Sequence, residues 1–309
     1  MSTITFPGLG LELNPPRGFA IPGTDFMIYF YGVIIAVGLV LAVIYGMRRS
    51  SQFGLKQDDI LDGVLFIVPV AIICARAYYC IFEWEQYHSF ADLINIRKGG
   101  LAIYGGVIGA AVGVVVFSRI KKVSLPAVLD LVALGFLIGQ SIGRWGNFIN
   151  REAYGAPTEF FLRMGLVVDG QQQYFHPTFL YESLWNAVGF IVLHFLSKKR
   201  QYDGQIALSY VAWYGLGRAM IEGLRMDSLY LGPFRVSQLL AAVSCAAAVV
   251  VLLVMNMRPH DRAKLFVNRI AAEAAEAEEA AEEAAEEDGE TAEAVETAET
   301  VETAEGQAQ

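Results

Sequence analysis

The sequence Gly143-Arg144-Trp145-Gly146-Asn147-Phe148-Ile149-Asn150-Arg151-Glu152-Ala153-Tyr154-Gly155 follows directly on an apolar run, residues 125–142, that is long enough to cross a bilayer. Its polar side chains therefore enter at the membrane edge, where an unsolvated charge is costly. Arginines at the end of a membrane helix often extend into the interface, which gives both arginines a purely structural interpretation. That interpretation leaves the two asparagines and the glutamate unexplained. The stretch therefore marks the end of a transmembrane span and also a candidate site.

The composition is that of a membrane protein. The chain of 309 residues is 55% hydrophobic and 18% charged, and its mean hydropathy is +0.42, values that soluble domains of this length seldom show. Of the net charge of −9, the fifteen acidic residues after Arg269 contribute −15, so the rest of the chain carries +6. A positive body suits a protein whose cytoplasmic edges face anionic lipid. Cys74, Cys80 and Cys245 all lie in apolar runs and are expected to be buried thiols.

Apolar runs predict an all-α multi-pass membrane protein with seven transmembrane helices and a small extracytoplasmic head domain. The runs are residues 26–47, 60–82, 101–117, 125–142, 178–196, 205–221 and 234–257. Basic clusters follow the first, third, fifth and seventh runs, so the positive-inside rule places the N-terminus outside and the C-terminus in the cytoplasm.

This topology divides the chain into five parts. They are an irregular extracytoplasmic arm at residues 1–25, four spans at 26–150, an extracytoplasmic head at 151–177, three spans at 178–257, and an acidic cytoplasmic tail at 258–309. The head is expected to contain a hairpin turn at Asp169-Gly170. The Ala/Glu-rich tail has no apolar face to bury, so we expect it to be disordered or partly helical.

Other features of the spans indicate packing. Glycines recur at four-residue spacing in the third and fourth runs, which is typical of closely packed membrane helices. They are Gly105, Gly109, Gly113, Gly135, Gly139 and Gly143. Arg76 in the second run and Asp130 in the fourth are interpreted as a structural ion pair.

A stripe of polar residues runs along the sixth apolar run. Tyr214, Arg218, Glu222 and Arg225 stand at i, i+4, i+8 and i+11, which places them on one helical face. A glutamate between two arginines is consistent with a purely structural ion-pair network. The same stripe leaves a surplus positive charge which, together with Arg144, would suit an anion.

The fifth run contributes two further polar residues. His176 precedes Pro177 at the predicted helix start, so it has a simple interpretation as a helix-entry residue. Glu182, one turn inside, requires a cationic partner if it is buried. Tyr31 and Tyr104 add hydroxyl groups at membrane depth, although tyrosines are common at membrane edges.

Together these residues resemble the bacterial phosphatidylglycerol–prolipoprotein diacylglyceryl transferases. The motifs that carry the resemblance are Gly143-Arg144-x-Gly146-Asn147-Phe148-x-Asn150-x-Glu152, Tyr31-Gly32, the Gly-Gly-x-x-x-x-Gly-Gly element around Tyr104, His176-Pro177-x-x-x-Tyr181-Glu182 and Tyr214-Gly215-x-x-Arg218-x-x-x-Glu222-x-x-Arg225. They occur in family order up to about Met257. Only the acidic tail lies outside the resemblance.

The resemblance implies an enzyme of the bacterial plasma (inner) membrane that carries out the first step of lipoprotein maturation. It would transfer the sn-1,2-diacylglyceryl group of phosphatidylglycerol to the thiol of the lipobox cysteine of a preprolipoprotein, forming a thioether and releasing glycerol phosphate. The implied partners are phosphatidylglycerol, the lipobox-containing signal peptide and the lipid bilayer. No nucleic acid, metal or other cofactor is implied.

The resemblance also assigns roles to the site residues. Arg144 and Arg218 match the family's phosphate-handling arginines, which are permanently charged donors suited to a leaving phosphate. Glu152 and Glu222 would orient the arginines, the two asparagines would donate to lipid oxygens, and Tyr31 would line the pocket. The complete set of lipid-binding candidates is Tyr31, Arg144, Asn147, Asn150, His176, Glu182, Arg218, Glu222 and Arg225, and the catalytic candidates are Tyr104, Arg144, Glu152 and Arg218.

The sequence departs from many family members at Tyr104. Those members have a histidine in the Gly-Gly element, where it has been proposed as the base that deprotonates the thiol. Our hypothesis is that Tyr104 lies close to Arg144 or Arg218 and acts either as a partly ionised base or as an orienting hydrogen-bond donor, since nearby positive charge lowers the pKa of a phenol. His176, Glu152 and the departing phosphate are the alternative acceptors.

Two other functional classes account for part of the sequence. A secondary transporter would also place charges within the bundle, but it would be expected to show an inverted repeat, and none is evident. A membrane scaffold would explain the glycine spacing and the tail. It would not explain why polar residues of several spans are predicted to meet near one membrane face.

Overall fold

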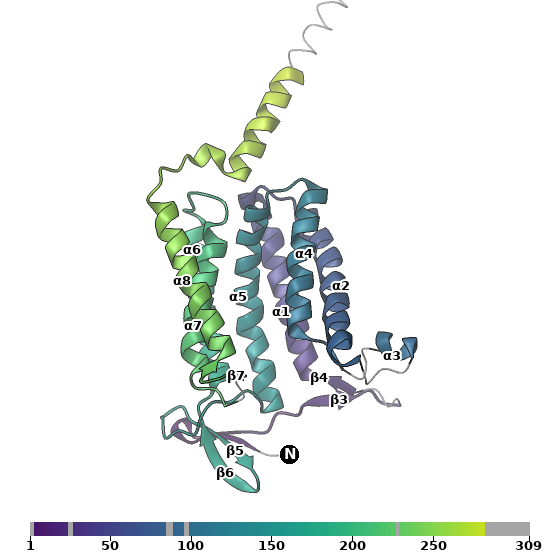
Figure 1. Ribbon diagram of the computed structural model, residues 1–309, viewed down its shortest axis with the longest axis vertical. Helices are drawn as coiled ribbons and strands as arrows, with labels where there is room; N and C mark the ends of the chain where they lie inside the picture. Colours follow the sequence, from purple (N-terminus) through teal and green to yellow (C-terminus); the bar gives the residue numbers. More distant parts are fainter. Residues whose placement is uncertain (1–2, 24–26, 85–88, 96–98, 227–228, 282–309) are drawn as a thin grey trace, which may run out of the picture.

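The computed structural model describes residues 3–23, 27–84, 89–95, 99–226 and 229–281 of the chain and is mostly helical (Figure 1). Within this part, six helices are long and apolar enough to cross a membrane, consistent with a multi-pass membrane protein. They are α1 (Phe30–Arg49), α2 (Gln57–Phe82), α4 (Ile103–Lys121), α5 (Leu125–Asn150), α6 (Thr178–Ser197) and α8 (Val236–Asn256). The more polar α7 (Gln205–Glu222) packs against α6 and α8. A short helix, α3 (Phe90–Ile94), lies between α2 and α4 in the chain.

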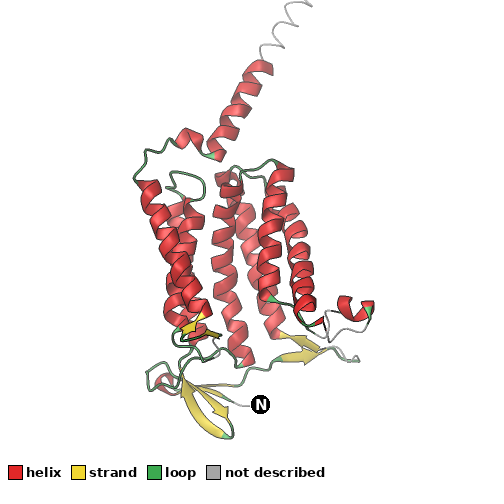
Figure 2. Cartoon of the chain, in the orientation of Figure 1, coloured by secondary structure: helices red, strands yellow, loops and turns green. Residues whose placement is uncertain are grey.

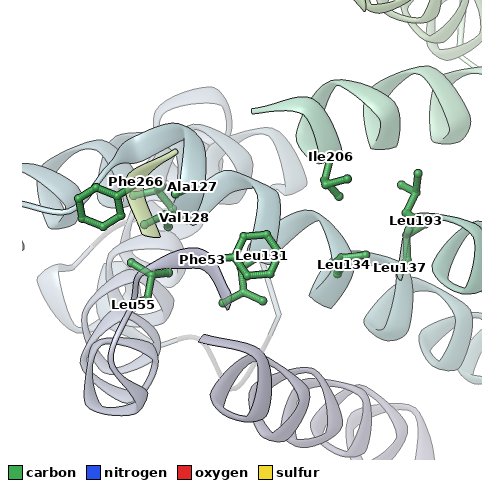
Figure 3. Packing of buried hydrophobic residues seen from close by; sticks show 11 residues of the cluster. Phe53, Leu55, Ala127, Val128, Leu131, Leu134, Leu137, Leu193, Ile206 and Phe266 are labelled. Carbon is green, nitrogen blue, oxygen red and sulfur yellow. The ribbon is translucent and has the colours of Figure 1, made fainter. Parts of the chain in front are cut away.

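Helix α5 is the central element of the bundle. It contacts α1, α4, α6 and α7, while α2 packs on α4 and α8 packs on α7 (Figure 1). Its buried leucines pack with side chains of α6, α7 and the C-terminal segment, as Figure 3 shows. The labelled residues of this core are Phe53, Leu55, Ala127, Val128, Leu131, Leu134, Leu137, Leu193, Ile206 and Phe266.

The ends of α5 follow from local sequence. Ser124 is the N-cap and its hydroxyl accepts from the Ala127 N–H at 3.5 Å, a typical helix start. The helix ends where Arg151 adopts a left-handed conformation with φ of 57°. The predicted span ended at residue 142, so the helix extends eight residues further, to Asn150, and carries most of the polar stretch on its last two turns.

The glycines pack helices closely, which confirms the packing interpretation. A Cβ atom placed on Gly109 would lie 2.5 Å from the Cβ atom of Cys74, and one on Gly105 would lie 2.5 Å from the Cβ atom of Tyr78. On the neighbouring pair, the Cβ position of Gly38 in α1 lies 3.5 Å from the Cα atom of Gly139 in α5. Helix α4 therefore approaches α2 at a distance that larger residues would prevent, whereas α1 and α5 meet across Gly38 at an ordinary van der Waals distance.

The predicted pair between Arg76 and Asp130 is wrong. Arg76 donates to backbone carbonyls between α2 and α4, including Asp92 O at 2.7 Å and Gly100 O at 2.8 Å. Asp130 accepts from the backbone N–H groups of Gly204 at 2.9 Å and Ala207 at 2.8 Å. Each charge is satisfied by backbone dipoles, and for Asp130 these are the unpaired N–H groups at the start of α7.

The strands gather at one end of the bundle (Figure 2). A four-stranded sheet has the order β2-β1-β5-β6 and is built from β1 (Ile4–Phe6), β2 (Leu11–Leu13), β5 (Met164–Val168) and β6 (Gln171–Phe175). All its paired strands are antiparallel. Two-stranded ribbons are formed by β3 (Gly18–Ala20) with β4 (Met27–Tyr29) and by β7 (Tyr230–Leu231) with β8 (Phe234–Arg235).

The N-terminal arm differs from the irregular segment that we expected. Ile4 and Phe6 are buried with Met164, Leu166 and Phe175, so the arm is held to the later segment by a shared core. Ile4 and Phe6 alternate with an intervening polar residue, as in a strand, but the turn residues at 7–10 leave this pattern too short to detect from the sequence. The turn predicted between β5 and β6 is confirmed, because Asp169 and Gly170 both have positive φ, 52° and 77°, as a tight hairpin requires.

The C-terminal segment returns to the opposite end of the bundle (Figure 1). Leu265 and Phe266 are buried, and the Phe266 N–H donates to Asp203 at 2.8 Å. Phe266 also lies against Gly54 and packs with Phe53 in the core described above. Residues 266–281 are helical and expose their acidic side chains, while residues 282–309 of the predicted tail lie outside the described part.

Two alanine substitutions in α4 provide a test of this close packing. We expect Gly109→Ala to destabilise the protein by about 1–3 kcal/mol, because the new methyl group overlaps Cys74. In the matched control Gly106→Ala, the new Cβ atom lies 3.7 Å from Ala75, so stability should hold or rise. Thermal unfolding in detergent measures both, and equal unfolding temperatures for the two variants would contradict the packing argument.

Candidate functional site

Three arginines and two glutamates from separate elements form a buried ion cluster, called the arginine–glutamate cluster below. Its members are Arg144 of α5, Glu182 of α6, Arg218 and Glu222 of α7, and Arg225 just after α7. Arg218 Nη1 lies 2.9 Å from Glu182 Oε1, and Arg218 Nη2 lies 2.5 Å from Glu222 Oε2. Arg144 Nη2 contacts Glu182 Oε2, while Arg225 Nη1 lies 3.5 Å from Glu182 Oε1. The structure thus brings the polar stripe of α7 to Arg144, as the sequence predicted.

Glu182 is the centre of the cluster, since three arginines share its two oxygens. Its side chain is only 4% exposed and that of Glu222 is 2% exposed. A carboxylate so far from water requires cationic partners, and its three arginines meet the expectation from sequence. Arg144 is the most accessible of the arginines, with 22% of its side chain exposed, compared with 17% for Arg218 and 11% for Arg225.

Two tryptophans with reciprocal hydrogen bonds hold α6 against α7 about one helical turn from Glu182 and Arg218. Trp185 Nε1 donates to Trp213 O, and Trp213 Nε1 donates to Trp185 O, each at 3.0 Å. The two rings stack with centroids 4.6 Å apart. Each ring lies directly on a glycine of the facing helix, Gly217 or Gly189, where a Cβ atom would collide with the indole. This arrangement sets the separation at which Glu182 meets Arg218.

A second reciprocal contact joins α5 to α6. Ser141 Oγ donates to Ser183 O at 2.9 Å, and Ser183 Oγ donates to Ser141 O at 2.8 Å. Trp145 Nε1 also donates to Ser183 Oγ at 3.2 Å. Ser141 is close to Arg144 along α5, and Ser183 is next to Glu182 along α6. These bonds therefore fix the positions of the two helices that carry this ion pair.

Asn147 links the cluster to Glu152. Arg144 Nη1 donates to Asn147 Oδ1 at 3.3 Å, and Asn147 Nδ2 donates to Glu152 Oε1 at 2.9 Å. Asn150 Nδ2 lies 3.4 Å from the same oxygen. We expected Glu152 to orient the arginines, and the structure connects it to Arg144 through Asn147. The asparagine amides, which we expected to donate to lipid oxygens, are directed at this carboxylate.

An unusual backbone turn places Glu152 there. Arg151 and Ala153, on either side of it, have φ of 57° and 56°, a left-handed conformation that is uncommon for residues other than glycine. The turn is held by Thr178 Oγ1, which donates to the Ala153 carbonyl. Nothing in the local sequence indicated this conformation at Ala153.

An apolar cavity opens beside the cluster. It has a volume of ≈ 560 Å³ and lies among α1, α2, α4 and α5, with mainly aliphatic lining. Its polar lining includes Tyr31, Arg144 and Asn147 near the strand-bearing end, and Gln140 one turn of α5 further in. The sequence analysis identified Tyr31 as a lining residue but missed Gln140, although a glutamine in an apolar run was a visible signal.

Two predicted site residues, Tyr104 and His176, belong neither to the arginine–glutamate cluster nor to the lining of the cavity. Tyr104 is 53% exposed at the start of α4, and α4 contributes Ala110, Val114 and Phe117 to the cavity. The structure therefore does not place it with the arginines. His176 Nδ1 lies 3.2 Å from the Tyr181 hydroxyl, and burial lowers the pKa of its imidazole below the ordinary value, so it is mostly neutral at neutral pH. Across the described ranges, His, Cys, Asp and Glu side chains form no group of three that could hold a metal ion.

Comparison with known proteins gives consistent results. Residues 17–254 match the family model described as prolipoprotein diacylglyceryl transferase. The chain is similar to proteins named phosphatidylglycerol–prolipoprotein diacylglyceryl transferase from several bacteria. Identity is 41% with that of Clostridioides difficile, covering 75% of this chain and 92% of that protein. It is 43% with that of Bacillus velezensis, covering 81% and 94%, and 43% with that of Enterococcus faecalis, covering 82% and 92%.

The shared carboxylate gives a stability prediction. Glu182→Gln leaves three buried guanidinium groups without their common counter-ion, so we expect a loss of about 3–5 kcal/mol of unfolding free energy. Adding Arg144→Gln removes one of the unpaired charges and should recover part of that loss. Thermal unfolding of the single and double variants in detergent measures the coupling. Purely additive effects would show that the Arg144–Glu182 pair contributes no coupling energy.

Proposed function

The chain belongs to the prolipoprotein diacylglyceryl transferase family, and from this premise we infer that it transfers the diacylglyceryl group of phosphatidylglycerol to a prolipoprotein, the first step of lipoprotein maturation. One observation connects this function to the site described above. Arg144 is part of the arginine–glutamate cluster and also lines the apolar cavity. A molecule that is apolar at one end and anionic at the other would satisfy both environments, as a phospholipid does.

In the proposed complex, the acyl chains occupy the cavity and the phosphate lies at the cluster. The aliphatic lining suits the chains, because burying apolar surface is favourable. Arg144 is the arginine that reaches this space, and Arg218 supports it through their shared partner Glu182. Glu222 and Arg225 complete the ion pairs that hold Arg218 and Glu182 in place.

The reaction we propose is a nucleophilic displacement at the carbon of the diacylglyceryl group that carries the phosphate. The sulfur of the lipobox cysteine forms a bond to this carbon, and the carbon–oxygen bond to the phosphate breaks. Glycerol phosphate leaves with the electron pair, and the thiol proton passes to an acceptor. Negative charge increases on the phosphate oxygen as the bond breaks, so fixed guanidinium groups stabilise the transition state more than the ground state.

The geometry favours Glu152 as the proton acceptor over our first candidate, Tyr104. Glu152 is exposed, and a single bridging residue, Asn147, separates it from Arg144. A carboxylate can also accept a proton directly, whereas a phenol must first lose its own proton. Tyr104 lies outside the lining of the cavity, so it would have to approach from another position. His176 is engaged with Tyr181, and burial lowers the pKa of its imidazole, which makes it a weaker proton acceptor.

We place the cluster near the outer face of the bacterial plasma membrane. The N-terminal arm and the segment at 151–177 would be extracytoplasmic, α7 would be the seventh span, and the C-terminal tail would be cytoplasmic. The basic residues after α1, α4, α6 and α8 support this orientation. The shared sheet and the cluster would then face the side on which signal peptides present the lipobox cysteine.

Transfer of radiolabelled diacylglycerol to a lipobox peptide tests the proposed role of the arginines. We expect Arg144→Ala to lower kcat/KM by about 10²–10³, as removal of a transition-state donor does. Arg144→Lys keeps the positive charge but lacks the planar guanidinium group, so its kcat/KM should lie between those of the wild type and Arg144→Ala. The control Arg119→Ala, an exposed arginine at the other end of α4, should be unaffected. Near-normal transfer by a folded Arg144→Ala protein would refute the role.

Two isosteric substitutions distinguish the proton acceptors. Glu152→Gln keeps an oxygen that can accept from Asn147 but cannot take the proton, so we expect a loss of about 10²–10⁴ in kcat. Tyr104→Phe is expected to leave kcat near the wild-type value. Both are measured in the peptide assay with saturating lipid. The reverse pattern would assign the proton to Tyr104 and restore our first hypothesis.

A further inference from the structure

Gln140 is a partly buried polar residue that the proposed chemistry does not use. It lies on α5 one helical turn before Arg144 and lines the same cavity. Its Nε2 atom donates to the Tyr210 hydroxyl of α7 at 2.8 Å. Tyr210 in turn stacks on Tyr214, with ring centroids 5.7 Å apart. The side chain is therefore held in one position, at the inner end of the polar stripe that leads to Arg218.

The amide of Gln140 has hydrogen-bonding capacity left over. Its Oε1 atom is buried and has no hydrogen-bond partner among the described residues. An amide nitrogen has two hydrogens and Tyr210 takes one of them, so a donor remains. If the amide is flipped, the Tyr210 hydroxyl donates to the oxygen and both N–H groups remain. In the orientation of the structure, the spare Nε2 hydrogen therefore belongs to a residue that lines the apolar cavity.

Such a residue is costly in a membrane helix. An unsatisfied polar group away from water destabilises the fold, and a leucine at this position would avoid the cost. Polar residues in ligand cavities usually fix the orientation of a ligand, because a few such groups are placed among apolar ones. A ligand that brings a hydrogen-bond acceptor to this depth would use the spare Nε2 hydrogen of Gln140.

The spacing between Gln140 and Arg144 along α5 indicates which acceptor group of the lipid would bind Gln140. Gln140 is four residues, or about 6 Å, further into the bundle than Arg144. In a diacyl phospholipid the ester carbonyls follow the phosphate by a few bonds and are the only strong acceptors between headgroup and chains. With the phosphate at Arg144, an ester carbonyl would lie one helical turn deeper, beside Gln140.

We propose that Gln140, positioned by Tyr210, donates a hydrogen bond to an ester carbonyl of the lipid substrate and so makes the enzyme selective for ester-linked lipids. This inference rests on the proposed function, because it requires the phosphate to bind at Arg144. Gln140 would recognise the type of linkage between the glycerol and the acyl chain. The arginine–glutamate cluster would recognise only the headgroup.

Matched lipid donors test this proposal. Purified full-length protein in detergent micelles is given phosphatidylglycerol or its diether analogue, which has the same chains but no ester carbonyls, with a lipobox peptide as acceptor. One hydrogen bond corresponds to a preference for the ester of roughly two- to tenfold in kcat/KM. In Gln140→Leu the preference should disappear, because the donor is gone. Tyr210→Phe should reduce it, because Gln140 loses its anchor.

Gln238→Leu is the matched control. Gln238 also donates between helices, from α8 to Ala219 O of α7 at 2.9 Å, and it does not line the cavity. Its ester preference should equal that of the wild type. If Gln140→Leu does not fold, Gln140→Met, which keeps the side-chain length, replaces it.

The outcomes separate the two proposals. No ester preference in the wild type, or an unchanged preference in a folded Gln140 variant, would overturn the role of Gln140 while transfer itself continues. Failure of both lipids as donors to wild-type protein would instead refute the proposed function. A preference lost in the Gln140 variant and kept in Gln238→Leu would support the inference.

Discussion

The structure depends on the need to keep two carboxylates charged inside a membrane bundle. Glu182 and Glu222 are almost completely shielded from water, and charge in such a place is tolerated only with close counter-ions. Arg144, Arg218 and Arg225 supply these counter-ions from different elements. The positions of α5, α6 and α7 at this level are therefore coupled, since displacing any one helix would leave charges unpaired.

The surrounding contacts meet this requirement with few types of interaction. Reciprocal side-chain to backbone bonds join α5 to α6 through the serines and α6 to α7 through the tryptophans. Glycines on the facing helices remove the atoms that would hold the helices apart. The hydrophobic effect gives little direction between helices in lipid, so hydrogen bonds and close packing set the geometry. Arg144 consequently faces a cavity whose shape is set by backbone positions.

Sequence patterns predicted much of this arrangement. Apolar run lengths gave the helices of the bundle, and helical periodicity placed Arg218, Glu222 and Arg225 on one stripe near Arg144. The positive-φ hairpin at Asp169 followed from turn chemistry. These succeeded because each rests on a local rule: run length, the 3.6-residue repeat, or the conformations allowed to a residue type.

The failures have a common physical cause. Arg76 and Asp130 are satisfied by backbone groups outside their own helices, and residue types alone do not reveal where such groups will lie. Glu152 reaches Arg144 through Asn147 because of the left-handed turn at Ala153. The strand that joins the arm to the later segment pairs residues about 160 positions apart. Tertiary structure decided each case, and local propensity did not indicate it.

The anchoring of the C-terminal segment has a practical consequence for handling the protein. Leu265 and Phe266 are buried with the turn that follows α1, so the chain beyond the last span is part of the folded body as far as this point. A protease that cuts after Arg269 would release the acidic extension and leave the body intact. A cut before Leu265 would expose Phe53 and remove part of the core at the end of the bundle opposite the strands. Affinity or fluorescent labels are therefore best attached beyond residue 269.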